Sequence, residues 1–173
     1  FEIQFGKNKY LTNIEVAMKN IFSIYGDLSY LVKKDQINPA IHRINFVDFV
    51  RSRIEFFTQT AIKFKSKFEF IHKTDEIILD FNEIKLQRIV DNNLTNAIKY
   101  TLENETIYVV LKVHRADCDL IIESRSAQIL DPQKIFEEYH REEISKEGFG
   151  LGLNLVKRIC NEENVGIRSE ERR

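Results

Sequence analysis

The chain has 173 residues, of which 43% are hydrophobic and 31% are charged, a composition typical of a soluble domain rather than a disordered chain. Its 26 basic and 27 acidic residues nearly cancel, so no overall electrostatic field favours nucleic acid or an anionic membrane as a partner. Two cysteines make neither a disulfide framework nor a metal-ligand cluster, and no apolar run approaches the ~20 residues that span a bilayer.

Residues 13–33 predict a long amphipathic helix. Apolar residues recur there at spacings of three and four, as in the a and d positions of a heptad: Ile14, Ala17, Ile21, Ile24, Leu28 and Leu31. A face this broad has to pack on something. Two partners stay open: the rest of this chain, or a helical hairpin or bundle shared with another chain. A cationic helix end followed by Asn38–Pro39 predicts a boundary, between a unit at 1–36 and a domain at 37–173.

The remainder alternates between helical and extended patterns. We expect strands at 44–46, 67–72, 77–81, 106–114, 120–123 and 165–169, and helices at 48–64, 83–102, after Pro132 and at 150–161. Asn82 is the predicted N-cap of the helix at 83–102. This order favours an α+β fold, an α/β sandwich with a mixed, mostly antiparallel sheet, preceded by one long amphipathic helix.

The helix at 83–102 carries polar residues where helix formers are expected. Asn and Asp are mediocre in helix interiors, yet Asn92, Asn96, Lys99 and Glu103 share one stripe at about 100° per residue. Carboxamide oxygens are hard ligands that suit Mg²⁺, which takes few protein ligands beside phosphate oxygens and water. Lys99 lies one turn after Asn96, where its ammonium can meet the same phosphates. The alternative is a solvated polar stripe.

A second unusual segment places Gly148, Gly150 and Gly152 directly before a predicted helix. Each interior Gly costs about 1 kcal/mol relative to Ala, but closely spaced glycines let backbone N–H groups approach phosphate, which the helix dipole favours. The charged loop at 140–147 precedes them and can close over a ligand and supply cations. The alternative is a flexible surface loop.

Three segments together resemble the sensor histidine kinase family. Residues 92–101 look like its N box, 135–141 like its F box, and 148–156 like its second glycine box, in the family's order and spacing. The resemblance covers about residues 44–169 and implies the Bergerat ATP-binding α/β sandwich. The helix at 13–33 resembles the second helix of the family's dimerisation and phosphotransfer hairpin.

The resemblance also implies roles for individual residues, with ATP and Mg²⁺ as cofactors. Asn96 would coordinate Mg²⁺, Asn92 would assist at the same metal or its water, and Lys99 would contact phosphate, which makes these three the candidate catalytic residues. Tyr100 would line the nucleotide pocket. Gly148, Gly150 and Gly152 would shape the lid hinge and the phosphate-facing backbone, and the remaining nucleotide contacts implied are Ser124, Arg141, Leu151 and Leu153.

The chain departs from the family at its first glycine box. The stretch at 124–129 lacks both glycines, and Ser124 stands where an Asp normally accepts a hydrogen bond from the adenine amino group. A hydrogen bond to a charged group contributes roughly 1.5–3 kcal/mol, so its loss could weaken ATP binding about 10- to 150-fold. Ser124 could still bond adenine through its hydroxyl or a water.

The expected phospho-acceptor histidine is also missing from residues 1–36, since the four histidines are His42, His72, His114 and His140. The chain begins without Met, so we expect a piece of a longer protein that does not autophosphorylate by itself. In the intact protein the γ-phosphoryl of Mg-ATP would pass to a histidine and then to an aspartate of a response regulator. The competing interpretation is a non-catalytic pseudokinase that binds partners through its helices.

We further expect a homodimer formed through the N-terminal helix, a response regulator receiver domain as partner, and no contact with nucleic acid or membrane. Cys118 and Cys160 are expected to be small buried side chains in a reducing compartment. This piece should therefore be cytoplasmic, whether or not its parent kinase is anchored in a membrane.

Overall fold

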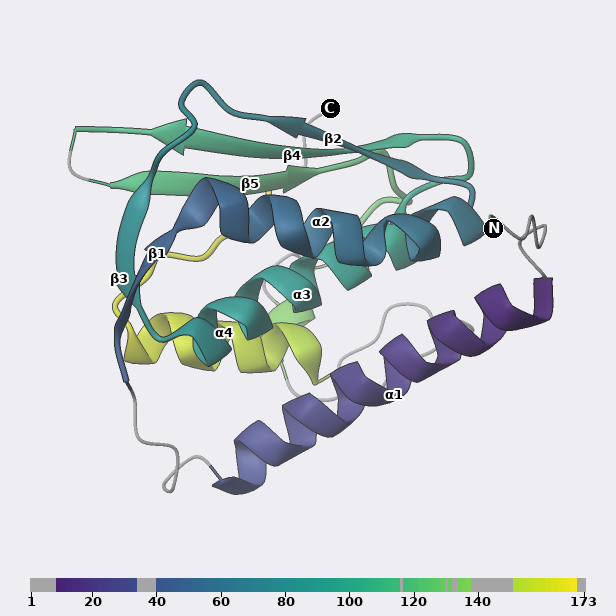
Figure 1. Cartoon of the computed structure of the whole chain (residues 1–173), viewed down its shortest axis with the longest axis horizontal. Helices are drawn as coiled ribbons and strands as arrows, with labels where there is room; N and C mark the ends of the chain where they lie inside the picture. The colour runs from purple at the N-terminus through teal and green to yellow at the C-terminus, as the bar shows by residue number, and fades with distance from the viewer. Residues whose placement is uncertain are drawn as a thin grey trace, which may run out of the picture. The chain divides into compact units, whose positions relative to one another are not determined.

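A computed structural model of the chain describes residues 9–33, 40–115, 117–129, 131, 134–137 and 151–170. The chain divides into two compact units, Phe1–Asn38 and Pro39–Arg173. The first contains a single described helix, and the second contains the strands and three further α-helices (Figure 1).

Helix α1 (Lys9–Lys33) is longer at its start than the predicted 13–33. Large apolar side chains are exposed along it, namely Tyr10, Leu11, Ile14, Met18, Ile21, Phe22, Ile24 and Tyr25. A helix with so much exposed apolar surface gains stability mainly by packing. Within the described residues, none of the helices is both long and apolar enough to cross a bilayer.

The second unit holds two small sheets. Its five strands are β1 (His42–Asn45), β2 (Lys67–Ile71), β3 (Ile78–Phe81), β4 (Thr106–Val113) and β5 (Cys118–Glu123). β1 pairs antiparallel with β3, while β4 pairs parallel with β2 and antiparallel with β5. In β4, Ile107, Val109 and Leu111 are buried and Tyr108 is exposed, the period of two expected for a strand with one face on a core.

The other helices are α2 (Phe46–Lys63), α3 (Glu83–Tyr100) and α4 (Gly152–Glu162). They lie on one side of the β2–β4–β5 sheet (Figure 1). Apolar side chains of α2 and α3 meet those of β4 in one core, in which Val47, Val50, Val90, Leu94 and Val109 are fully buried. This arrangement confirms the predicted α+β sandwich with a mixed sheet.

Both long helices begin at asparagine caps. The Asn82 side chain accepts a hydrogen bond from the Lys85 amide at 3.0 Å, which confirms the predicted N-cap of α3. Asn45 caps α2 in the same way, accepting from the Val47 amide at 3.1 Å. Each cap satisfies one of the amide groups that a helix start leaves without an intrahelical partner.

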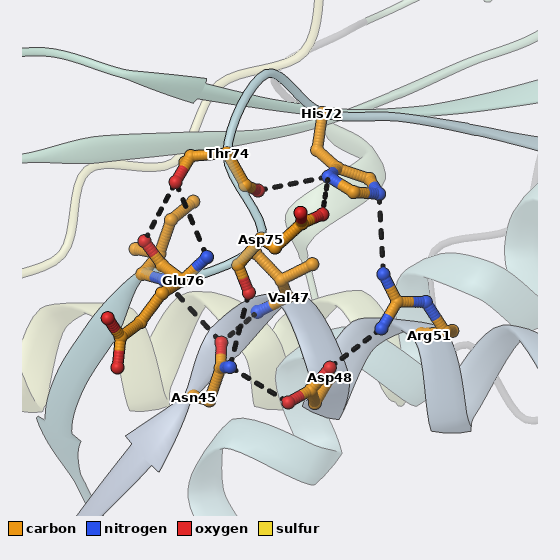
Figure 2. A network of polar contacts seen from close by, with 9 residues as sticks. Asn45, Val47, Asp48, Arg51, His72, Thr74, Asp75 and Glu76 are labelled. Atoms are coloured by element: carbon orange, nitrogen blue, oxygen red, sulfur yellow. Dashed lines mark hydrogen bonds and ion pairs between the residues drawn. The ribbon is translucent and has the colours of Figure 1, made fainter.

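A polar network ties the start of α2 to the loop that joins β2 and β3 (Figure 2). Asn45 donates from Nδ2 to Asp48 Oδ2 at 2.8 Å and to the Asp75 carbonyl at 3.3 Å. Arg51 bonds Asp48 at 2.7 Å and reaches His72 Nε2 at 3.4 Å. Because a guanidinium only donates, His72 accepts at Nε2 and donates from Nδ1 to the Thr74 carbonyl at 2.9 Å. The network fixes the loop between the two sheets.

Two expected elements differ in the structure. The expected helix after Pro132 is a single 3₁₀ turn, Lys134–Phe136. The strand predicted at 165–169 is wrong, because residues 163–170 form none. There α4 ends with Asn164 in the left-handed region (φ 54°) and the Val165 amide bonding the Cys160 carbonyl at 2.8 Å. This Schellman ending closes α4, and the described residues after it form no strand.

Candidate functional site

Helix α3 carries three asparagines with different environments. Asn92 is 5% exposed and donates from Nδ2 to the Arg88 carbonyl at 3.0 Å. Asn93 donates to the Ile89 carbonyl at 2.7 Å. Asn96 is half-buried and makes no side-chain hydrogen bond to any residue that the structure describes. Of the three carboxamides, only that of Asn96 has neither its nitrogen nor its oxygen in a hydrogen bond within the described part of the chain.

Lys99 and Tyr100 follow Asn96 in the last turn of α3, and both are half-buried. The helix ends at Thr101, whose amide bonds the Ala97 carbonyl at 3.0 Å. Lys99 is three residues after Asn96, so the two side chains share one face of the helix. The structure thus places the Asn96 carboxamide and the basic Lys99 on one stripe of α3.

Asn92 shares the predicted stripe with Asn96 but is the more buried of the two. It lies where α4 packs on α3, facing Gly152. A Cβ on Gly152 would overlap Asn92 Oδ1 and lie 3.2 Å from its Cγ. Gly152 therefore permits a close approach of the two helices.

A buried ion pair next to Asn92 was not anticipated from the sequence. Asp91 accepts two hydrogen bonds from Arg53 of α2, at 2.7 and 2.8 Å, and a third from Gln87 at 3.2 Å. Only 7% of the Asp91 side chain and 16% of the Arg53 side chain are exposed. The Arg53 guanidinium also lies over the Phe56 ring, 4.5 Å from its centroid. The sequence signal for this pair is the position of Asp91, an acidic residue directly after the apolar Val90 of the same helix.

The segment that replaces the first glycine box runs past the end of α3. The Leu102 amide bonds the Arg125 carbonyl at 2.9 Å, and Thr101 and Ser126 form an isolated antiparallel bridge. These bonds bring the half-buried Ser124, which follows β5, toward the end of the helix that carries Lys99.

The described part of the F box contacts α4. Asn154 donates to the Phe136 carbonyl at 3.1 Å, and Lys157 Nζ lies 5.9 Å from the centroid of the Phe136 ring. Helix α4 begins at Gly152 without a side-chain cap from Leu151 and without an acidic residue in its first turn. Leu151, Gly152 and Leu153 are half-buried at this start. Three other predicted contacts lie outside the described residues, namely Arg141, Gly148 and Gly150.

The donors near Asn96 suit Mg²⁺, and they do not suit a metal ion that takes all of its ligands from the protein. Among the described residues, His, Cys, Asp and Glu side chains form no group of three that could hold a metal ion. One carboxamide oxygen suits an ion that keeps water and takes most of its ligands from phosphate.

Neither cysteine belongs to this site. Cys160 is buried in α4, and burial raises the pKa of its thiol to about 11. The pKa of the half-buried Cys118 is raised as well, first by burial and then by the charges of Asp117 and Asp119. Both therefore stay protonated near neutral pH and are poor nucleophiles.

The comparisons with known proteins agree with this geometry. Residues 81–173 match the family of histidine kinase-, DNA gyrase B- and HSP90-like ATPases. The match covers α3, the segment after β5 and α4, and the chain belongs to this family.

Curated relatives are sensor histidine kinases. CusS of Escherichia coli (strain K12) is 26% identical over 171 residues, which cover 93% of this chain and 35% of CusS. HprS of the same strain is 29% identical over 160 residues, covering 90% of this chain and 33% of HprS. The chain thus spans about a third of the length of these relatives, and it resembles them along most of its own length.

Solved structures share the fold. Full-length ShkA in complex with AMPPNP has a TM-score of 0.68 at 16% identity, over 93% of this chain and 35% of that one. ThkA in complex with the response regulator TrrA has a TM-score of 0.71 at 16% identity, over 99% of this chain and 49% of that one. The fold of a histidine kinase catalytic domain is thereby confirmed.

Proposed function

We propose that this chain is the ATP-binding catalytic part of a sensor histidine kinase. In the whole protein it presents the γ-phosphoryl group of Mg-ATP to a histidine, from which the group is relayed to a response regulator. The observation that carries the proposal is the Asn96–Lys99 stripe. Asn96 is half-buried and makes no side-chain hydrogen bond within the described part of the chain, in a helix whose other carboxamides are bonded internally.

Each residue has a definite task in this scheme. The Asn96 carboxamide oxygen holds Mg²⁺, and the ion supplies charge neutralisation at the phosphates. Lys99 places a second cation on the same face of α3 for the phosphate oxygens. The first amides of α4, near Leu151 and Gly152, face phosphate with the positive end of the helix dipole. Phosphoryl transfer needs little more from the protein than such positioning.

The nucleobase end of the site is assigned to Ser124 and Tyr100. Ser124 follows β5, and the bonds of Arg125 and Ser126 to the end of α3 hold it near that helix end. Its hydroxyl can therefore hydrogen-bond the base in the pocket that Tyr100 lines. A neutral hydroxyl replaces the carboxylate of the family. We therefore expect weaker ATP binding than in a kinase that keeps the carboxylate, by about 10- to 150-fold.

The proposed partners follow from α1 and from the relatives. The apolar side chains exposed along α1 supply the surface for a homodimer, in which a second α1 completes a helical bundle. The ThkA structure contains a response regulator, and we propose a receiver domain as the partner of this protein too. The phosphoryl-accepting histidine is assigned to a helix of that bundle, and the domain is assigned to the cytoplasm.

A second function is favoured by one observation, the loss of the first glycine box at 124–129. In that scheme the chain is a pseudokinase whose pocket no longer holds ATP and whose α1 surface binds partners. The two schemes differ in a single measurable property, the binding of nucleotide.

The test is a calorimetric titration of the chain with a non-hydrolysable ATP analogue, with and without Mg²⁺. Magnesium-dependent binding is expected, and it should stabilise the fold by about 2.7 kcal/mol when the free ligand is 100 times its Kd. Asn96→Ala should abolish the magnesium dependence. Asn93→Ala is the matched control, the same substitution in the same helix at a carboxamide bonded to the helix itself. No binding at millimolar nucleotide would support the pseudokinase instead.

A further inference from the structure

Asn92 and Gly152 meet where α4 starts against α3. The Asn92 side chain is 5% exposed and held by its bond to the Arg88 carbonyl. Its carboxamide faces Gly152 so closely that a Cβ there would overlap Oδ1 and come within 3.2 Å of Cγ and 3.7 Å of Cβ. Even an alanine at position 152 therefore requires the Asn92 side chain or the first turn of α4 to move.

The rest of α4 leaves little room for such a movement. Along its length the helix buries Leu155, Val156, Ile159 and Cys160. At its far end, Lys85 of α3 pairs with Glu162 at 3.2 Å and with Glu163. Because the body and the far end are held, a side chain at position 152 displaces mainly the start of the helix.

We propose that Gly152 is a positioning residue, whose missing side chain lets Asn92 hold the first turn of α4 against α3. The contact lies one helical turn before Asn96, so it sets the phosphate-facing start of α4 relative to the metal-binding carboxamide. The inference rests on the proposed function. It gives Asn92 the task of aligning two binding elements, in place of direct contact with the metal.

The first experiment measures melting temperatures of the full chain without nucleotide. Gly152→Ala should lower the melting temperature by about 2–12 °C, because the added methyl group overpacks a buried contact. In the Asn92→Ala background the same change should raise it by about 1–4 °C, since replacing Gly by Ala then only reduces the entropy of the unfolded chain. Gly166→Ala is the matched control, because a Cβ there meets nothing within 4 Å. The same sign in both backgrounds would overturn the inference.

The second experiment measures the Kd of the ATP analogue well below the melting temperature of each variant, with and without Mg²⁺. Gly152→Ala should weaken binding in Mg²⁺ by about tenfold or more, with a smaller loss in its absence, because misplacement acts on the metal-bound phosphates. Asn92→Ala combined with Gly152→Ala should bind more tightly than Gly152→Ala alone. If Gly152→Ala only lowered the stability of the fold, the Kd of the analogue with Mg²⁺ and the Kd without it would both stay unchanged in the folded protein.

The outcomes separate the two proposals. If the unmodified chain binds no nucleotide, the proposed function fails and the positioning role fails with it. If the unmodified chain binds and the double variant recovers nothing, only the positioning role is overturned, and Asn92 acts directly at the metal.

Discussion

The Arg53–Asp91 ion pair gives the sharpest prediction about stability. The Arg53 side chain is only 16% exposed and its guanidinium packs on the Phe56 ring, so replacing Asp91 by Ala leaves a largely buried cation without its carboxylate. Removing one partner of a buried pair costs about 3–5 kcal/mol, because the remaining charge is uncompensated. We therefore expect Asp91→Ala to lower the free energy of unfolding by this amount.

A second ion pair provides the control. Lys65 and Glu103 lie 2.7 Å apart, the same separation as the shorter Arg53–Asp91 contact, and both pairs join residues 38 positions apart. Their side chains, however, are 60% and 67% exposed. An exposed pair contributes about 0–1 kcal/mol, so Glu103→Ala should cost no more than that. Because the two pairs match in distance and in sequence separation, the comparison tests the effect of burial alone.

The measurement is urea unfolding followed by far-ultraviolet circular dichroism, since the chain contains no Trp for fluorescence. Replacing both members of the buried pair by apolar residues, as in Arg53→Met with Asp91→Leu, should recover most of the loss, because no charge is then left buried. Equal costs for Asp91→Ala and Glu103→Ala would refute the argument that burial decides the strength of these pairs.

Three further predictions concern other parts of the chain. Asn82→Ala should lower the free energy of unfolding by about 1–2 kcal/mol, measured in urea, because it removes the cap of α3 and the 3.2 Å bond to the Ala40 carbonyl; a loss below a few tenths of a kcal/mol would contradict it. Because the pKa of Cys160 is raised to about 11 from 9.0, the unfolded thiol ionises first, so stability should fall as pH rises from 9 through 11. Cys160→Ala should flatten that part of the profile, and an unchanged slope would count against a buried thiol. Ile21→Asp, at an exposed position of α1, should reduce self-association in sedimentation without unfolding the domain; an unchanged oligomeric state would exclude α1 as the dimer surface.

Local sequence determined most of the elements and the chemistry-bearing motifs. The N-cap at Asn82 and the strand at β4 depend on a few neighbouring residues, and the structure confirms both, while the Asn96–Lys99 spacing is likewise set within one helix. The same holds for the order of the boxes, which a family match over residues 81–173 supports. A period of two or of 3.6 is set within one element, so it can be recognised before any packing is known.

The contacts between helices and strands were decided by the tertiary structure alone. The helical period placed Asn92 beside Asn96, but the packing of α4 buries Asn92 against Gly152 and leaves Asn96 half-buried. The pairing of Asp91 with Arg53 of another helix could not be predicted, because either charge alone is compatible with a solvated surface. The residues after α4 are predicted to form a strand, but α4 closes in a Schellman ending at Asn164 and residues 163–170 form no strand. Such contacts depend on the packing of segments far apart in the chain, which overrides local preference.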